Sequence, residues 1–255
     1  MKTIGIVTGA SSGMGKDFLQ TLPENIEVDE IWAISRNEKA IKEASKDMNV
    51  KVVPLAYDLS EEKNIKEIQK KLEKEKPLVK ILINAAGYGK FEKTTKVSYE
   101  DNIGMIKLNC EGLTSMCLIT IPYMKKGSKI INFASVAAFQ PVPYINIYAA
   151  SKAYVLSFSR SLNRELKTDG IQVMAICPYW TKTKFFDRAV TKNTIVKKYV
   201  AMYNSIDNVE RAWKDLKKGK DVSQWGFKAR AQVKLCKILP HSIVMSVWQK
   251  QQKLK

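Results

Sequence analysis

The sequence Thr8-Gly9-Ala10-Ser11-Ser12-Gly13-Met14-Gly15 follows the apolar, β-branched run of residues 2–8 and precedes a helix-compatible stretch at residues 16–20. A short run of this kind is typical of a buried parallel strand. Glycines allow a tight turn and a close approach to a pyrophosphate, and the following helix N-terminus offers free N–H groups. The stretch therefore predicts a dinucleotide-binding loop, although a glycine turn without a ligand is the alternative for the loop taken alone.

A second pattern supplies the chemistry that a hydride transfer needs. Tyr148 and Lys152 are four residues apart in a segment, 148–166, without proline or glycine, so a helix would place both on one face. Hydride transfer at a carbon bearing oxygen also needs a proton donor or acceptor. The single histidine, His241, lies near the C-terminus. A tyrosine can replace it if a nearby cation lowers its pKa from about 10.

The spacing of Gly9, Gly13 and Gly15 resembles the TGxxxGxG loop of the short-chain dehydrogenase/reductase family, similar to its NADP-dependent hydroxysteroid dehydrogenases and 3-oxoacyl reductases. The resemblance runs from Thr3 to about Thr183. It implies a Rossmann-type fold and a nicotinamide cofactor.

The resemblance also implies roles for four residues. Tyr148 would be the catalytic acid/base, and Lys152 would lower its pKa and hold the nicotinamide ribose hydroxyls. Ser135, thirteen residues before Tyr148, would hydrogen-bond the substrate oxygen. Asn109, on a long central helix over residues 103–124, would hold a water that relays protons to Lys152. A Tyr/Lys pair alone is more often an inconsequential surface pair, but the combination favours catalysis.

The residues expected to bind the cofactor lie at the ends of predicted strands and the starts of helices. They are Thr8, Gly9, Ser11, Ser12, Gly13, Met14, Gly15, Ser35, Arg36, Asp58, Leu59, Asn84, Ala85, Ala86, Gly87, Tyr148, Lys152, Pro178, Thr181 and Thr183.

Cofactor choice is predicted from the end of the second strand. NAD-binding folds usually place an acidic residue there for the ribose 2′-hydroxyl, whereas an arginine suits a 2′-phosphate. Ser35 stands in the place of the acid and Arg36 follows it. A guanidinium pairs well with phosphate. We therefore expect NADP(H) over NAD(H), with a solvated surface arginine as the alternative.

The loop after the sixth predicted strand departs from the family. Tyr179 follows Pro178 where the family usually has glycine, and glycine takes backbone angles that tyrosine disfavours. A local change of the loop is therefore expected. Tyr179 and Trp180 are either core residues or a wall for an apolar substrate. The residues expected to line the substrate space are Tyr88, Val136, Gln140, Val142, Tyr179, Trp180 and Phe185.

The length of 255 residues fits one domain. Strands are predicted near 3–8, 30–35, 50–56, 80–84, 129–134, 171–176 and 220–225, alternating with helices, which indicates a doubly wound parallel sheet. The predicted division is a dinucleotide-binding domain over 1–225, with a substrate loop at about 184–219, and a basic amphipathic extension over 226–255.

Composition bears on location and metal binding. No apolar run is long enough to span a membrane, and the N-terminus runs directly into the first strand, so no signal peptide is expected. The four cysteines lack metal spacing, which predicts reduced thiols in a cytoplasmic protein without a metal site.

The net charge of +18 is unevenly distributed along the chain. From Lys214 to the C-terminus there are eleven Lys and Arg, and the only acidic residues are Asp215 and Asp221. A solvated lysine-rich surface is the simplest explanation. A basic amphipathic segment with a tryptophan is also typical of an interfacial membrane helix, and some lipid- and steroid-handling family members end similarly after a break like Leu239-Pro240. We predict that 226–255 forms two short helices broken at Pro240, at the substrate mouth and able to touch anionic membrane. A pocket lid or a subunit contact is the alternative; nucleic-acid binding is not expected.

Together these patterns predict an NADP(H)-dependent oxidoreductase that interconverts a secondary alcohol and a ketone on an apolar substrate, a steroid, bile acid or lipid-like molecule. The apolar helices over 103–124 and 148–166 resemble the family's subunit interface and predict a homodimer or homotetramer. The first alternative is a 3-oxoacyl-(carrier protein) reductase, because a basic surface attracts an acidic carrier. The second is a non-catalytic nucleotide-sensing protein, which would have no use for a proton donor.

Overall fold

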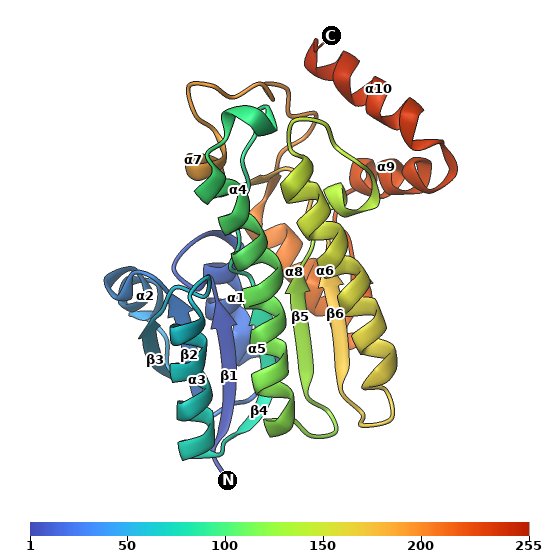
Figure 1. Ribbon diagram of the computed structural model, residues 1–255. Coiled ribbons are helices and arrows are strands. Elements are labelled where there is room, and N and C mark those ends of the chain that lie inside the picture. The colour runs from blue at the N-terminus through green and yellow to red at the C-terminus, as the bar shows by residue number, and fades with distance from the viewer. Residues whose placement is uncertain (255) are drawn as a thin grey trace.

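A computed structural model describes residues 1–254 and shows a central sheet between two layers of helices (Figure 1). The strands of this sheet are β1 (Thr3–Thr8), β2 (Glu30–Ser35), β3 (Lys51–Ala56), β4 (Leu78–Asn84), β5 (Lys129–Phe133), β6 (Gln172–Ile176) and β9 (Val222–Ser223). Their order is β3-β2-β1-β4-β5-β6-β9, and all neighbours are parallel. The predicted Rossmann-type, single-domain α/β fold is confirmed. Its strand order changes direction between β1 and β4, where ligands bind in such folds.

The strands form where the sequence is apolar and β-branched. Five of the six residues of β1 and of β2 are buried, as expected of strands covered on both faces. Pro54 lies in β3, which is an edge strand, where a missing N–H interrupts no ladder on the open side. A second, two-stranded sheet pairs β7 (Thr181–Lys182) with β8 (Tyr203–Asn204) and was not predicted.

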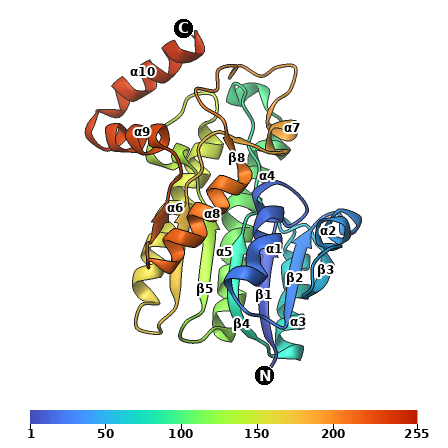
Figure 2. The same cartoon turned by 180° about the vertical axis from the view of Figure 1, so that it is seen from behind.

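Helices cover the two faces separately, as Figures 1 and 2 show from opposite sides. One face holds α3 (Glu62–Glu75), α5 (Leu113–Thr120) and α6 (Asn146–Glu165), and the other holds α1 (Gly13–Asn25), α2 (Glu38–Ser45) and α8 (Ser205–Lys217). Each face has its own apolar core. In the second core, Phe18 of α1 contacts Trp213 of α8 edge-to-face at 5.2 Å between ring centroids.

The helix predicted over 103–124 is interrupted. The structure has α4 (Tyr99–Ile106), a π-helical segment at Lys107–Gly112, α5 and a short 3-10 turn at Ile121–Tyr123. A Cβ on Gly112 would lie 2.5 Å from the Leu59 carbonyl oxygen, so the helix passes unusually close to the loop after β3. π-Helical turns are frequent at functional sites, and Asn109 lies within this one.

Three further helices lie beyond the carboxyl ends of the strands (Figure 1). They are α7 (Phe185–Ala189), α9 (Phe227–Ile238) and α10 (His241–Gln252). The last two are separated at Pro240, as the sequence predicted. No helix within residues 1–254 is long and apolar enough to cross a membrane.

Candidate active site

A cavity of about 770 Å³ lies at the carboxyl ends of the strands. Its lining runs from the glycine loop through the ends of β2, β4 and β5 to α9 and α10. A cavity at this end of an open parallel sheet is the expected place for a ligand, and this one has room for a cofactor and a substrate together.

The glycine loop forms one end of the cavity. Its backbone is packed so closely against neighbouring backbone that side chains would not fit at two positions. Gly9 has φ of +66°, and a Cβ there would lie 2.9 Å from the backbone of Ala85 and Ala86. A Cβ on Gly15 would lie 2.2 Å from the Gly9 carbonyl oxygen. Both positions therefore require glycine.

The start of α1 is suited to a phosphate. Its N-cap residue, Ser12, makes no side-chain cap hydrogen bond, and the first turn has no acidic side chain. Ser12 and the first residues of α1 line the cavity, and helix N-termini with free N–H groups are suited to bind a pyrophosphate.

Nearly all the residues predicted to bind the cofactor line this cavity; the exceptions are Thr8 and Asn84. Thr8 lies behind the surface, where its Oγ1 accepts a hydrogen bond from the Ala86 N–H at 3.1 Å. Asn84 donates from Nδ2 to Oδ1 of Asn132 at 3.0 Å. Both residues hold strand ends in place behind the cavity.

The Ser/Tyr/Lys group meets at the middle of the cavity. Ser135 follows β5, and its Oγ accepts the N–H of Ala137 at 3.1 Å; its side chain also acts on Tyr148, where it lowers the pKa of the phenol. Lys152 is buried; its Nζ lies 5.7 Å from the Tyr148 ring centroid and donates to the Phe133 carbonyl at 2.6 Å. The structure thus brings together three side chains that the sequence predicted as a catalytic group and that lie up to seventeen positions apart in the chain.

The electrostatics of this group differ from the expectation that the pKa of Tyr148 is brought below its usual value. Burial raises the pKa of Tyr148 to about 12, and the hydrogen bond with Ser135 opposes this rise only in part. Burial also lowers the pKa of Lys152 to about 8. Desolvation dominates because protein encloses both groups. Tyr148 therefore holds its proton at neutral pH, when Lys152 is largely charged.

Asn109 lies beside Lys152 but does not line the cavity. It is fully buried; its Oδ1 accepts the Tyr88 N–H at 3.1 Å, and its Nδ2 donates to the Tyr88 carbonyl at 2.9 Å and to Ser151 Oγ at 3.0 Å. A Cβ on Gly87 would lie 2.9 Å from Asn109 Oδ1 and 3.4 Å from Lys152 Nζ. The π-helical segment therefore brings this amide next to the ammonium group, separated from the cavity by Gly87.

Arg36 and Asp58 lie at the opposite end from Tyr148, where both line the cavity. Arg36 is exposed. Burial raises the pKa of Asp58, but hydrogen bonds from the Ser60 hydroxyl and N–H outweigh it, with Arg36 and Arg188 adding to the net lowering. Asp58 is therefore a fixed acceptor beside two guanidinium groups.

Arg188 is a residue that the sequence did not single out. It lies on α7, its guanidinium carbon is 3.3 Å from the centre of the Tyr88 ring, and it is 3.7 Å from Asp101. It lines the cavity near Arg36 and Asp58. No pattern in the sequence could have found it, because only the fold brings this residue over Tyr88.

Aromatic side chains form the substrate end of the cavity. All seven residues predicted to line this space do line it, and Phe91, Phe186 and Trp248 join them. Trp180 packs against Phe91 at 5.6 Å and Trp248 at 6.4 Å between centroids. Trp180 is thus a partly buried residue that packs against an apolar cluster and also lines the cavity.

The loop with Tyr179 in place of glycine shows no left-handed backbone strain. The non-glycine residues with positive φ in the described chain are Lys76, Tyr144 and Lys253, so Tyr179 is accommodated in an ordinary conformation. The local change expected from losing glycine does not involve a strained tyrosine.

Comparison with known proteins settles the family. Residues 3–194 match the family model described as short chain dehydrogenase. The chain belongs to the short-chain dehydrogenase family. It is therefore an oxidoreductase of the kind that acts on alcohol and ketone groups, and the nicotinamide-binding features of the cavity fit the cofactor that such enzymes use.

Relatives with named activities are 30% identical to this short-chain dehydrogenase over the part of the chain that aligns. A NADP-dependent 3-hydroxy acid dehydrogenase of Schizosaccharomyces pombe is 30% identical over 190 residues, 72% of this chain and 73% of the relative. A 3-ketodihydrosphingosine reductase of Bacteroides thetaiotaomicron is 30% identical over 186 residues, 71% of this chain and 65% of the relative.

Solved structures share its fold. A short-chain dehydrogenase of Sphingobium yanoikuyae in complex with NADPH has a TM-score of 0.77 at 24% identity, covering 94% of this chain and 96% of that one. A Burkholderia phymatum enzyme in complex with NAD has a TM-score of 0.80 at 20% identity, covering 92% of both chains. Both nicotinamide cofactors thus occur on this fold.

Proposed function

We propose that this short-chain dehydrogenase interconverts a secondary alcohol and a ketone on an apolar substrate, with NADP(H) as its preferred cofactor. The observation that carries the proposal is the position of Ser135, Tyr148 and Lys152. They lie between a glycine-loop end and an aromatic end of one cavity. A proton donor at this junction faces both a hydride source and an apolar ligand.

The reaction assigns a task to each side chain. A bound nicotinamide supplies or accepts the hydride. In reduction, Tyr148 donates its proton to the substrate oxygen, and Ser135 orients that oxygen by a hydrogen bond. Lys152, charged below its pKa of about 8, stabilises the phenolate that forms. Asn109 acts through Lys152 and is a positioning residue.

The preference for NADP(H) rests on Arg36. Its guanidinium lies at the end of β2, with no acidic residue in the neighbouring position 35, and lines the cavity close to Asp58. A 2′-phosphate would meet a charged planar donor there, which is a strong pairing. The S. pombe relative, named as NADP-dependent, is consistent with this choice.

An apolar substrate, a steroid, bile acid or lipid-like molecule, is favoured by the aromatic end of the cavity. Four residues from three separate parts of the chain contribute to that wall, Phe91, Trp180, Phe185 and Trp248. The B. thetaiotaomicron relative is named as the reductase of a lipid, 3-ketodihydrosphingosine, which has the same apolar character. Reduction of a 3-oxoacyl group on an acidic carrier remains the second candidate, favoured by the net charge of +18.

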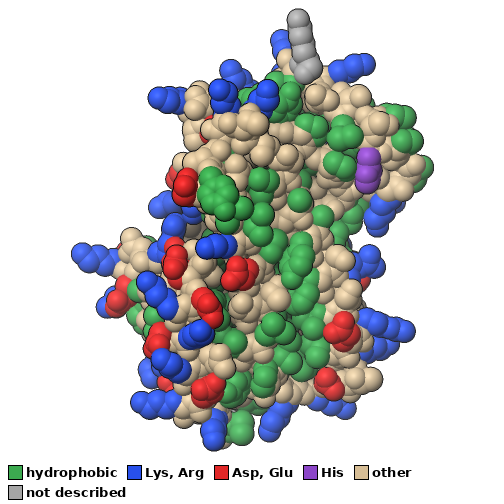
Figure 3. Space-filling model, viewed as in Figure 1, with side chains coloured by type: hydrophobic (Ala, Val, Ile, Leu, Met, Phe, Trp, Pro, Cys, Tyr) green, Lys and Arg blue, Asp and Glu red, His purple; other side chains and the backbone are tan. Residues whose placement is uncertain are grey.

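We also propose a homodimer or homotetramer in the cytoplasm. A strip of hydrophobic side chains runs over α5 and α6 in Figure 3, and Leu118 and Tyr154 there are 61% and 44% exposed. Exposed apolar strips of this kind mark protein contacts. Light scattering of the purified protein tests the oligomer.

Oxidation of NADPH against a panel of ketones tests the activity. The panel should include ketosteroids, long-chain 3-oxoacyl thioesters and small polar ketones. We expect turnover with the bulky apolar ketones. Turnover confined to carrier-bound substrates would favour the second candidate, and cofactor binding without turnover of any ketone would favour a nucleotide sensor.

A further inference from the structure

The two C-terminal helices carry exposed apolar side chains at the rim of the cavity. Four residues both line the cavity and are solvent-exposed: Phe227 (79%), Leu235 (56%), Leu239 (37%) and Val247 (48%). Ile238 (79%) and Ile243 (48%) are exposed on the outer surface of the same helices without lining the cavity. These six exposed apolar side chains of α9, α10 and the turn between them are here called the rim surface.

The two helices that carry the rim surface also carry basic residues and no acidic ones. Residues 226–255 contain no Asp or Glu, and their described basic residues are all exposed: Lys228, Arg230, Lys234, Lys237, Lys250 and Lys253. In Figure 3 the upper right of the molecule, which α9 and α10 form, shows hydrophobic and basic side chains. This combination is repelled by cations and attracted by anionic surfaces.

Side-chain contacts hold α10 against the rest of the enzyme. Trp248 donates from Nε1 to the Pro143 carbonyl at 3.0 Å and stacks on Trp180. Gln252 accepts the N–H groups of Lys197 and Lys198 at 3.1 and 3.0 Å. The inner faces of both helices are thus buried against the enzyme, at Val233 and Cys236 of α9 and at Val244 and Trp248 of α10, whereas the rim surface is exposed.

We infer that the rim surface docks on an anionic lipid bilayer, so that the cavity opens toward the membrane. Large apolar side chains that protrude beside lysines insert at the headgroup boundary of a bilayer. A second copy or a carrier protein seated there would cover the cavity mouth, whereas a bilayer both covers the apolar rim and contains the apolar substrate. The substrate part of this argument rests on the proposed function; the docking itself does not.

Sedimentation with vesicles tests the docking without any substrate or turnover. We expect the full chain to sediment with mixed phosphatidylcholine–phosphatidylglycerol vesicles at low salt and to be largely released at about 1 M salt, where the Debye length is about 3 Å. Vesicles of phosphatidylcholine alone should bind much less. No binding to the anionic vesicles at low salt overturns the inference.

Two variant pairs separate charge from apolar insertion. Lys234→Gln with Lys250→Gln should weaken binding about thirty-fold, because each basic residue near an anionic surface contributes about 1 kcal/mol. Ile238→Ser with Ile243→Ser should weaken it at every salt concentration. The matched control, Lys39→Gln with Lys63→Gln, removes the same charge from exposed positions on α2 and α3 and should bind like the unaltered protein.

The same variants distinguish the other possible occupants. An Ile238/Ile243 variant that changes the oligomeric state, while vesicle binding is unaltered, would make the rim surface a subunit contact and overturn membrane docking. If the tail pair and the control pair weaken vesicle binding equally, the binding depends only on net charge, and docking through the rim surface is overturned. Failure of the ketone screen with intact vesicle binding would instead count against the proposed function alone.

Discussion

Replacing Tyr148 by phenylalanine removes one hydroxyl and leaves the ring, its contact with Phe185 and the helix unchanged. The pKa of Tyr148 is raised to about 12 by burial, so nearly every molecule holds the proton at neutral pH. Loss of this donor leaves only water or Ser135 to protonate the product oxygen. General acid catalysis typically supplies roughly 10²–10⁴-fold, which corresponds to about 2.7–5.4 kcal/mol in the barrier. We expect kcat to fall by that factor.

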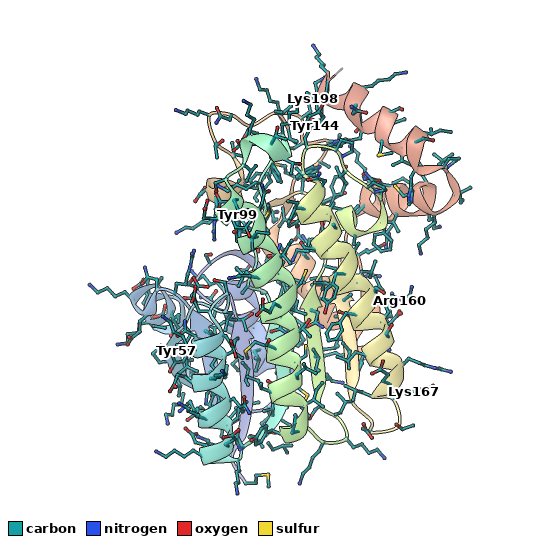
Figure 4. The ribbon with its side chains drawn as sticks, viewed as in Figure 1. Tyr57, Tyr99, Tyr144, Arg160, Lys167 and Lys198 are labelled. Atoms are coloured by element: carbon teal, nitrogen blue, oxygen red, sulfur yellow. The ribbon has the colours of Figure 1, made fainter. Side chains whose placement is uncertain are left out.

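The assay is NADPH oxidation with the best ketone from the panel, together with a direct measurement of NADPH binding by fluorescence. The affinity for NADPH should change little, because the ring remains. Tyr144→Phe is the matched control: Tyr144 lies four residues earlier, near the cavity end of the molecule in Figure 4, and does not line the cavity. Tyr148→Phe activity above about a tenth of the unaltered rate would refute the proton-transfer role.

The pH dependence follows from the neighbouring lysine. Burial lowers the pKa of Lys152 from 10.5 to about 8, so its positive charge is present below pH 8 and is lost as pH rises through that value. Reduction should therefore decline on the alkaline side from about pH 8, well below the pKa of Tyr148. Lys152→Met should lower the rate and remove this alkaline limb. A limb that persists in the variant would assign it to another group.

Three further substitutions test other parts of the cavity. Arg36→Asp should weaken NADPH binding by about 1.5–3 kcal/mol, the usual range for a hydrogen bond to a charged group. NADH binding should stay nearly unchanged. Equal losses of affinity for both cofactors would show that Arg36 does not contact the 2′-phosphate. Gly15→Ala places a Cβ 2.2 Å from the Gly9 carbonyl oxygen. Both the Tm and the affinity for NADPH should therefore drop. An unaltered melting curve would contradict the packing described for the loop. Trp248→Ala removes the hydrogen bond to Pro143 and the stack on Trp180; KM for an apolar ketone should rise while NADPH affinity holds, and Trp248→Phe should recover part of the loss.

Local chemistry made much of this molecule predictable. The glycines before α1, the apolar strands and the i, i+4 pair of Tyr148 and Lys152 are short-range patterns whose physical causes lie within a few residues. The two tail helices were also predictable, because Pro240 cannot continue a helix in the middle of an apolar, basic run. These patterns, with the family resemblance that they carry, were enough to predict the fold class and about half of the residues that line the cavity.

Features that depend on tertiary packing were not predictable. The π-helical segment around Asn109 arises where Gly112 passes the Leu59 carbonyl, a contact between distant parts of the chain. Arg188 reaches Tyr88 only because α7 folds back over the cavity. The sign of the Tyr148 pKa shift was also missed, because the sequence shows the neighbouring lysine but not the burial that outweighs it.

The cofactor-binding residues and the C-terminal helices occupy separate parts of the chain, and this separation has an evolutionary consequence. Every residue proposed to hold the cofactor or move the proton precedes position 184, whereas α9 and α10 supply the mouth and outer wall of the substrate space. Mutations in the tail can therefore alter which ketone fits without disturbing the hydride chemistry. A chimera that carries the C-terminal helices of another short-chain dehydrogenase should therefore shift its substrate range toward that of the donor while keeping this enzyme's cofactor preference.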